Sequence, residues 1–330
     1  MAINPLVVST ARKGWRWQWE KLMNGLAPSD REGNYKRPPS QHKNAVIPLK
    51  EDLVNRPCEF LPGLIIGRSC PWAHRTWLVY KIRKLNDTLN LHIAHANHKT
   101  GQWELNPGWL NCNSVQEIYK KCDSLLTNRA TVPALIDPGK SFLDKATLLG
   151  NESAQLVEAL NIWPSKNEVN LAPNHLIKEI KYWNNLLQDN VNNGVYKCGF
   201  ARNQKSYEEA SNKLFETLTI VDKHLNKKGP WLCGEELTIA DICLFPTLIR
   251  WESVYEPFFK CSKKPLWLYP NICSWRQKLI AINEIYETCD SAKWRKDYYG
   301  ALFPLNPSNI IPNGPDIMTI TNFNIQNQND

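Results

Sequence analysis

Apolar positions between about residues 60 and 165 alternate between two spacings. Residues 63–67 (GLIIG) form a short apolar run of the kind that makes a buried strand. Residues 71–85 carry apolar side chains at the spacing of one helix face. Patterns of these two kinds follow one another as strand, helix, strand, helix, strand, strand and helix, at residues 63–67, 71–85, 88–96, 114–122, 131–137, 141–144 and 151–161. Because strands interleave with helices, this part of the chain is predicted to form an α/β sheet.

The second half of the chain has a different pattern. Residues 174–190 and 203–227 both show helical periodicity, and no further strand pattern appears. In the stretch GEELTIADICLFPTLIRW, Thr238 is placed to cap a helix and Asp241, three residues later, to complete a capping box. We therefore predict a helical second half in which this motif starts a buried helix and has a structural role.

The N-terminal arm is irregular and rich in tryptophan. Its stretch KGWRWQWEKLMNGLAP is predicted to form one short helix that ends near Gly25 and Pro28. Exposure of Trp15, Trp17 and Trp19 to water would be costly. We therefore expect the arm to wrap around the body of the protein.

The C-terminal tail is rich in proline. ALFPLNPSNIIPNGPD is expected to run extended over the surface, and the Asn-rich last ten residues are expected to be disordered. Together these patterns predict four segments, which are an N-terminal arm (1–50), an α/β domain (51–165), an all-helical domain (174–300) and an extended C-terminal tail (301–330).

Composition and charge restrict the class of protein. Of the 330 residues, 42% are apolar and 22% are charged, which suits packed cores. The net charge is +8, and residues 1–44 supply +5 of it through eight basic and three acidic residues. Since the remainder is nearly balanced, we expect no nucleic-acid partner. Apolar runs stay far below the ~20 residues of a membrane span and no secretory signal is evident, so we expect a cytoplasmic protein without a membrane partner.

Metal sites and disulfides are not expected from the ten cysteines. None of them is spaced as C-x2-C or C-x4-C, and most are expected to be small core residues. His92, His95 and His98 offer three imidazoles that could bind a metal. However, a spacing of three does not put side chains on one face of a strand. We therefore expect no metal.

Cys70 stands at the start of the helix predicted at 71–85. Pro71 suits the first helical position, which places Cys70 at the cap, where free amides and the helix dipole favour a thiolate. With added charge from Arg68 and Arg75, the thiol pKa is expected to be lowered, which would make the sulfur a nucleophile. A dithiol motif would have its second cysteine at Ala73, so an external small thiol must resolve a mixed disulfide. The alternative is a buried core cysteine.

Two further stretches are candidates for binding a peptide-like ligand. In a thioredoxin-type fold, TVP at 131–133 would hold a cis proline opposite the cysteine, which would leave the backbone of Val132 free to pair with an extended peptide. Glu152 and Ser153 begin a helix, where the helix start and the hydroxyl suit a carboxylate and the acidic side chain suits an ammonium. Plain capping and an ordinary loop proline are the alternatives. Together with Cys70, these sites match the parts of glutathione in order.

Several motifs then resemble one known family. CPWAHRTWLV, RATVPALID, NES, VYKCGFA and DYYGALFPLNPSNIIPNGP are similar to the glutathionyl-hydroquinone reductases, the Xi class of glutathione transferases, over roughly residues 30–315. The resemblance implies a thioredoxin-like N-terminal domain that binds glutathione, an all-α C-terminal domain and a homodimer. It also implies a glutathione-dependent oxidoreductase that reduces glutathionyl-hydroquinones, with glutathione as co-substrate.

The resemblance also assigns roles to individual residues. Cys70 matches the catalytic cysteine of the family. Positions that bind glutathione in the family fall on Trp103, Arg129, Val132, Glu152 and Ser153. Tyrosines that line the quinol pocket of the family fall on Tyr196 and Tyr298, which are therefore expected to assist the reaction.

Two other functions fit the same residues. An omega-like thioltransferase or dehydroascorbate reductase would use the same sulfur on a different substrate. A non-catalytic ligand carrier would keep the helical fold but would have no need for a reactive thiol.

Overall fold

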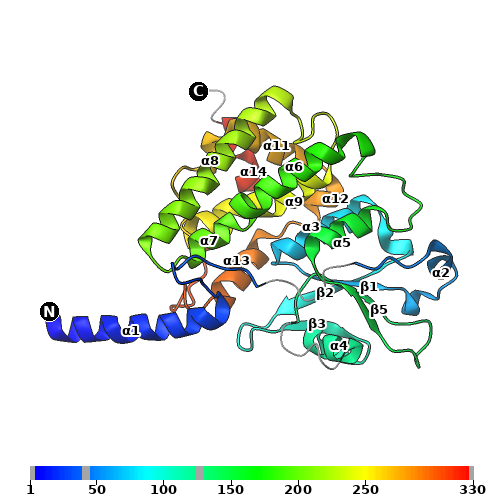
Figure 1. Ribbon diagram of the computed structural model, residues 1–330, viewed down its shortest axis with the longest axis horizontal. Helices are drawn as coiled ribbons and strands as arrows, with labels where there is room; N and C mark the ends of the chain where they lie inside the picture. The colour runs from blue at the N-terminus through cyan, green and yellow to red at the C-terminus, as the bar shows by residue number, and fades with distance from the viewer. Residues whose placement is uncertain (1–3, 39–44, 124–129, 327–330) are drawn as a thin grey trace.

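The computed structural model describes residues 4–38, 45–123 and 130–326 of the chain. One half of the body is a six-stranded sheet with helices on both faces, and the other half is helical (Figure 1). The strands are β1 (Gly63–Gly67), β2 (Asn90–Ala96), β3 (Trp103–Trp109), β4 (Cys112–Ser114), β5 (Ala134–Asp137) and β6 (Thr147–Gly150). These features confirm the predicted α/β first half and helical second half.

The sheet is mixed, in the order β4-β3-β2-β1-β5-β6. The central pair β1 and β2 is parallel, and every other neighbouring pair is antiparallel. Around it lie α2 (Lys50–Val54), α3 (Pro71–Ile82), α4 (Val115–Cys122) and α5 (Ser153–Asn161). Figure 1 shows α3 and α5 on the side that faces the helical half and α4 on the other side. As a result, α3 lies between the sheet and the helical half.

One predicted strand is wrong. Residues 141–144 form turns, because the Asp144 carboxylate accepts hydrogen bonds from the backbone N–H groups of Lys140 and Ser141. The side chain of Phe142 is 89% exposed, so these apolar residues do not belong to the sheet. The strand lies just beyond them, as β6, and β3 and β4 were not predicted at all.

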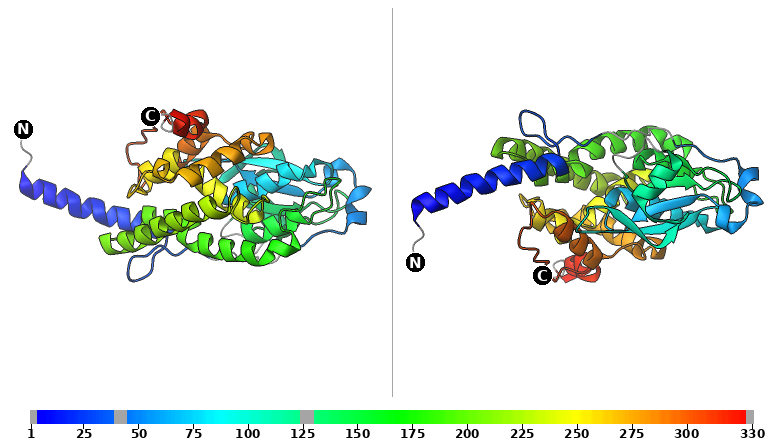
Figure 2. Two further views of the ribbon diagram at one scale, coloured as in Figure 1. Left: turned by 90° about the horizontal axis from the view of Figure 1, so that it is seen from above. Right: turned by 90° about the horizontal axis from the view of Figure 1, so that it is seen from below.

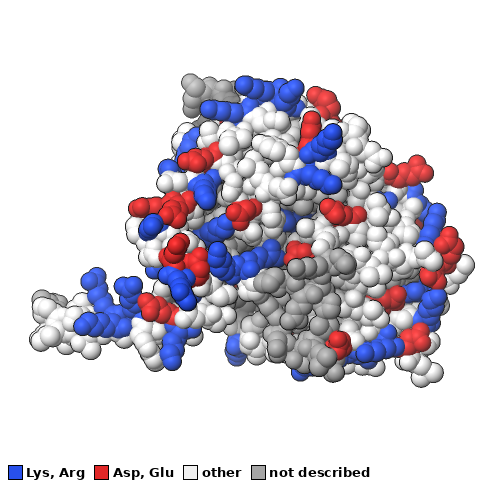
Figure 3. All heavy atoms as spheres, in the orientation of Figure 1, with Lys and Arg blue, Asp and Glu red and all other residues white. Residues whose placement is uncertain are grey.

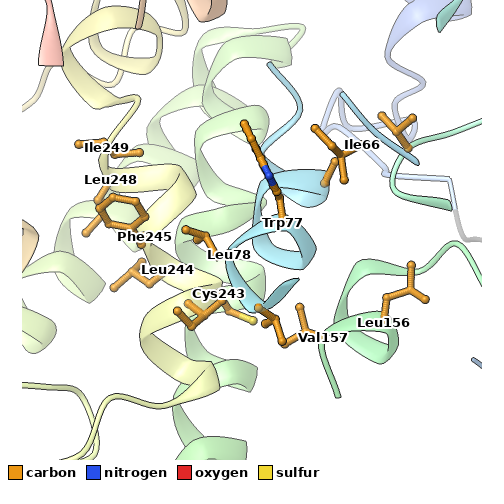
Figure 4. Close-up of a cluster of buried hydrophobic side chains, with 14 of the residues drawn as sticks. Ile66, Trp77, Leu78, Leu156, Val157, Cys243, Leu244, Phe245, Leu248 and Ile249 are labelled. Carbon is orange, nitrogen blue, oxygen red and sulfur yellow. The ribbon is translucent and has the colours of Figure 1, made fainter. Parts of the chain in front are cut away.

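The helical half is built around α9, whose residues are all buried. Figure 4 shows side chains of α9, including Leu244 and Phe245, against Trp77 and Leu78 of α3, with Val157 of α5 beside them. The helices of this half are α6 (Ile177–Leu187), α7 (Gly194–Phe200), α8 (Gln204–Lys228), α9 (Ile239–Leu248), α10 (Glu256–Phe258), α11 (Pro270–Ile280), α12 (Asn283–Tyr286), α13 (Ser291–Ala301) and α14 (Ile317–Gln326). The two halves therefore share one apolar core.

The predicted capping box at the start of α9 is confirmed. The Asp241 carboxylate accepts hydrogen bonds from the backbone N–H of Thr238 and Leu232 and from the indole N–H of Trp275. Asp241 is fully buried, and this burial raises the pKa of its carboxyl group in spite of those hydrogen bonds. The motif thus joins three segments of the helical half, as its structural role requires.

The N-terminal arm packs on the body only after its helix, where the Ala27 and Glu32 carbonyls accept hydrogen bonds from Arg202 and Asn203, so the prediction that it wraps around the body is wrong for the helix. Its helix α1 (Pro5–Leu26) is longer than expected, because Asn4 caps it and Pro5 occupies its first position. Figures 1 and 2 show α1 projecting away from the body. Trp15 and Trp17 are each 59% exposed, and only the end of α1 is anchored, where Met23 is buried.

The C-terminal tail is extended only in part. Residues 302–316 contain no helix in the described structure, but α14 follows them and contradicts the predicted extended tail and the predicted disorder over 321–326. An Asp316 oxygen caps α14 by accepting from the Thr319 N–H, and Ile317 and Ile320 are buried. Residues 327–330 lie outside the described residues.

Surface charge is mixed on one face of the body. On the face drawn in Figure 3, acidic and basic side chains are interspersed over the body, while basic side chains predominate on the projecting helix. Along the described stretches, no helix combines the length and apolar character that a bilayer crossing requires.

Candidate active site

Cys70 lies where β1 ends and α3 begins. It caps α3, Pro71 follows at the first helical position, and the Cys70 carbonyl accepts the first helical hydrogen bond, from the His74 N–H at 2.9 Å. The thiol Sγ lies 3.5 Å from the Val132 carbonyl oxygen, across the start of the helix. The predicted cap position is therefore confirmed, and the side chain is half-buried, which leaves it accessible from a cavity.

The predicted lowering of the Cys70 pKa is wrong. Burial raises the pKa of the thiol above its ordinary value of 9.0 and outweighs the effects of the Ala73 and Trp72 N–H groups. The arginine charges that act most strongly in the opposite direction belong to Arg250 and Arg37.

The two arginines named from the sequence are engaged elsewhere. Arg68 lies 3.9 Å from Asp290, and Arg75 packs over the Trp72 ring and donates to Gln188.

A cavity of about 730 Å³ surrounds the exposed edge of Cys70. It brings together seven of the eight site residues predicted from the sequence, which are Cys70, Trp103, Val132, Glu152, Ser153, Tyr196 and Tyr298. Arg129 lies outside the described residues. Residues more than two hundred positions apart in sequence therefore share one cavity.

One wall of the cavity is formed where strands β1, β2, β3 and β5 begin or end. The Val132–Pro133 bond is cis, as predicted, and the Trp103 ring packs so closely against Gly67 that a Cβ at this glycine would lie 2.4 Å from it. Gly67 precedes Cys70 by one turn, so a side chain here would displace either Trp103 or the turn.

The start of α5 forms the next part of the wall. Glu152 occupies the N-cap position without a capping hydrogen bond from its side chain, and Ser153 is buried with its hydroxyl 3.5 Å from a Glu152 carboxylate oxygen. Arg37 lies beside them, 3.9 Å from the Glu152 carboxylate, with its guanidinium over the Trp72 ring at 4.0 Å. A carboxylate and a guanidinium side by side can bind an ammonium and a carboxylate on one carbon.

Arg37 was missed by the sequence analysis, as was the contribution of the arm. Together with Arg37, the arm places Gly25, Leu26, Pro28 and Tyr35 on the cavity. No local pattern in an irregular segment indicates such contacts.

The opposite wall carries a cluster of tyrosines. The hydroxyl groups of Tyr196 and Tyr298 are 2.6 Å apart, and that of Tyr255 lies 3.2 Å from Tyr298. Burial raises the pKa of all three phenols, and that of Tyr196 and Tyr298 well above the ordinary 10. All three are therefore neutral at physiological pH and can donate hydrogen bonds. Tyr255 was not predicted as a site residue, because the resemblance assigned it no role.

The three histidines of strand β2 and its loop have separate environments. His92 stacks on Trp109 at 4.0 Å between ring centroids, and burial lowers its pKa to about 4. His98 lies 3.0 Å from a carboxylate oxygen of the buried Asp297. Within the described ranges, no group of three or more potential metal ligands is found. All ten cysteines are free thiols, and seven of them are buried, as expected for core residues.

The family model for the C-terminal domain of glutathione S-transferases matches residues 204–287. Glutathionyl-hydroquinone reductase PcpF of Sphingobium chlorophenolicum is 32% identical over 264 residues, which cover 76% of this chain and 82% of the relative.

Two solved structures are also similar. The Xi glutathione S-transferase of Phanerochaete chrysosporium is 30% identical, with a TM-score of 0.77 and coverage of 87% of this chain and 94% of that one. The glutathione-bound YqjG, a glutathione transferase homologue from Escherichia coli K-12, is 32% identical, with a TM-score of 0.71 and coverage of 78% and 86%. With the site geometry and these similarities together, the chain belongs to the Xi-class glutathione transferases, the family of the glutathionyl-hydroquinone reductases.

Proposed function

We propose that this protein transfers the glutathionyl group of glutathionyl-hydroquinones to glutathione, with Cys70 as the nucleophile. The observation that carries the proposal is the single cavity that joins the Cys70 thiol to a peptide-binding wall on one side and to the Tyr196–Tyr298 pair on the other. A relative named glutathionyl-hydroquinone reductase and a relative with bound glutathione support both halves of this assignment.

Glutathione would occupy the wall formed by these strand ends and α5. Its cysteine backbone would pair with Val132, which places the glutathionyl sulfur at Cys70. Its amino-acid end would lie at Glu152 and Ser153, where Arg37 adds a second charged partner. Trp103 would close this side of the cavity. Arg129 is assigned to glutathione binding by the motif match alone.

The reaction would proceed in two steps. The Cys70 thiolate attacks the glutathionyl sulfur, the bond between that sulfur and the ring carbon breaks, and the ring carbon takes up a proton. The hydroquinone leaves, and Cys70 remains as a mixed disulfide with glutathione. A second glutathione thiolate then attacks the glutathionyl sulfur, which releases oxidised glutathione and the Cys70 thiolate. One cysteine suffices, because the second glutathione resolves the mixed disulfide. This agrees with Ala73, which stands where a dithiol motif would have its second cysteine.

The tyrosines would act on the quinol. Their raised pKa values keep Tyr196 and Tyr298 protonated, so that they can donate hydrogen bonds to the quinol oxygens. In this way they would hold the ring and assist the proton transfer that accompanies departure of the leaving group.

The test is product analysis with a defined glutathionyl-hydroquinone and glutathione. We expect equimolar hydroquinone and oxidised glutathione from the native protein, and loss of both from Cys70→Ser. Faster turnover of a small mixed disulfide of glutathione than of the hydroquinone conjugate would contradict the proposal and favour an omega-like thioltransferase. Binding without turnover would favour a ligand carrier.

A second measurement identifies the intermediate. When the conjugate is supplied without free glutathione, mass spectrometry is expected to find one glutathionyl group, on Cys70. Cys58 is the internal control, because it is the exposed cysteine of the chain and lies outside the cavity. The homodimer that the resemblance implies is also a proposal, and light scattering of the purified protein tests it.

A further inference from the structure

Arg250 is a fully buried arginine between α9 and the π-helical segment Trp251–Tyr255. Among the ion pairs of the described residues, none involves this guanidinium. A guanidinium stays charged in proteins, and a buried charge without an opposite charge is costly. An arginine in this position therefore calls for a reason other than stability.

The partners of Arg250 are neutral, and two of them lie on either side of Cys70 in sequence. One guanidinium nitrogen donates to the carbonyl oxygen of Arg68 at 3.1 Å, and the other contacts the His74 Nδ1 at 2.9 Å. The charge also lies 4.0 Å from the ring centroid of Trp294, whose indole N–H donates to the same Arg68 carbonyl. Arg250 therefore connects the turn before Cys70 to the helical turn after it.

The protonation state of His74 follows from these contacts. Because an arginine can only donate, the His74 Nδ1 accepts and its Nε2 carries the proton. The Nε2–H then donates to the Thr288 hydroxyl at 2.7 Å, which donates to the Ile285 carbonyl at 2.6 Å. Burial and the Arg250 charge hold the pKa of His74 well below its ordinary value, so the ring is neutral. A neutral acceptor leaves the charge of Arg250 uncancelled.

Cys70 experiences this charge. Arg250 opposes the effect of burial on the thiol pKa, together with Arg37. The other titratable groups that line the same cavity are Tyr35, Tyr119, Glu152, Tyr196, Asp297 and Tyr298, with Tyr255 behind them. Of the two arginines, only Arg250 is fixed in the core by hydrogen bonds on both sides of Cys70.

We propose that Arg250 is a positioning residue for Cys70, and that its charge, held uncancelled between the Arg68 carbonyl and a neutral His74, stabilises the Cys70 thiolate. The inference rests on Cys70 as the nucleophile of the proposed function. Its test measures the reactivity of the thiol and not turnover. The role of Arg250 can therefore be disproved while the protein still turns over the conjugate, and it can be confirmed even if the conjugate is not a substrate.

The experiment is the pH dependence of Cys70 alkylation by iodoacetamide, followed on the Cys70 peptide by mass spectrometry. We expect Arg250→Gln to raise the pH midpoint by about 1 unit, which is a roughly tenfold lower alkylation rate at pH 7. Arg83→Gln is the matched control. Arg83 is buried at the C-terminal end of α3, whereas Cys70 stands at the start of that helix. Its guanidinium donates to the carbonyls of Leu160, Trp163, Asn167 and Val169.

An unchanged midpoint in folded Arg250→Gln, or an equal rise in Arg83→Gln, would overturn the proposal. A second pair of variants covers the case in which Arg250→Gln does not fold. His74→Asn keeps a neutral acceptor near the Nδ1 position, whereas His74→Asp has the same shape and cancels the Arg250 charge. We expect the midpoint to be about 1 unit higher in His74→Asp than in His74→Asn. Equal midpoints in this pair would also overturn it.

Discussion

The hydroxyl oxygens of Tyr196 in α7 and Tyr298 in α13 lie 2.6 Å apart on the wall of the cavity that contains Cys70. Tyr255 stands behind them, with its hydroxyl 3.2 Å from that of Tyr298, so the three phenols form one hydrogen-bonded cluster. Burial keeps all three protonated. The cluster can therefore donate hydrogen bonds from the cavity wall opposite the Cys70 sulfur.

Removal of the Tyr298 hydroxyl tests whether this cluster assists the reaction. Because Tyr298 contacts both other phenols, we expect Tyr298→Phe to lower kcat for a glutathionyl-hydroquinone by roughly a hundredfold. The KM for glutathione should change little, since the peptide-binding wall is untouched. Steady-state kinetics provide both values. Tyr182→Phe is the control, because Tyr182 is 58% exposed and outside the cavity. A kcat close to that of the native protein would show that the phenols do not take part.

Arg37 is expected to bind glutathione through its position beside Glu152. Charge-assisted hydrogen bonds contribute roughly 1.5–3 kcal/mol, so Arg37→Ala should raise the KM for glutathione roughly tenfold or more, with a smaller change in kcat. Arg16→Ala is the control, since Arg16 lies on the exposed part of α1 and pairs only with Glu20 among the described residues. If the KM rises equally in both variants, or in neither, Arg37 has no direct part in binding.

Local sequence patterns were sufficient to predict the elements that present the sulfur. The apolar run before Cys70, the proline after it and the apolar positions of the helix all lie within 23 residues. The capping box at Thr238 and Asp241 is equally local. Strand β3 was missed because its centre reads Asn-Pro-Gly, which is typical of a turn, and only its pairing with β2 and β4 makes it a strand.

The electrostatics of the site could not be predicted in the same way. The pKa of Cys70 depends on its burial and on Arg250, which is 180 positions away in the sequence. Arg37 and Tyr255 likewise enter the site through tertiary contacts alone. The projection of α1 was missed for the related reason that an apolar residue does not indicate which surface covers it.

Acid conditions are expected to destabilise the protein through buried histidines. The pKa of His92 is lowered to about 4, so the folded state disfavours its protonation. The stability that His92 contributes is therefore present above its unfolded pKa of about 6.5 and is lost as the pH falls toward 4. The loss should be on the order of 2 kcal/mol, and His74, whose pKa is also lowered, adds to it.

Urea unfolding at a series of pH values between 7 and 4 measures this effect. His92→Phe keeps a ring against Trp109 but cannot titrate, so its stability should fall less steeply with acid than that of the native protein. Equal slopes for the native protein and His92→Phe would contradict the prediction.

The capping box of α9 is expected to matter for stability more than any ordinary helix cap. Replacement of Asp241 by Ala would leave the N–H groups of Leu232, Thr238 and Trp275 without their acceptor in a fully buried position. Since each buried unsatisfied donor costs about 1–3 kcal/mol, we expect a loss of at least about 3 kcal/mol in the free energy of unfolding. Asp290→Ala is the matched control, because Asp290 caps α13 at a more exposed position and should cost only about 1 kcal/mol. Urea denaturation measures both losses. Equal losses would mean that burial at Asp241 adds nothing to the capping interaction.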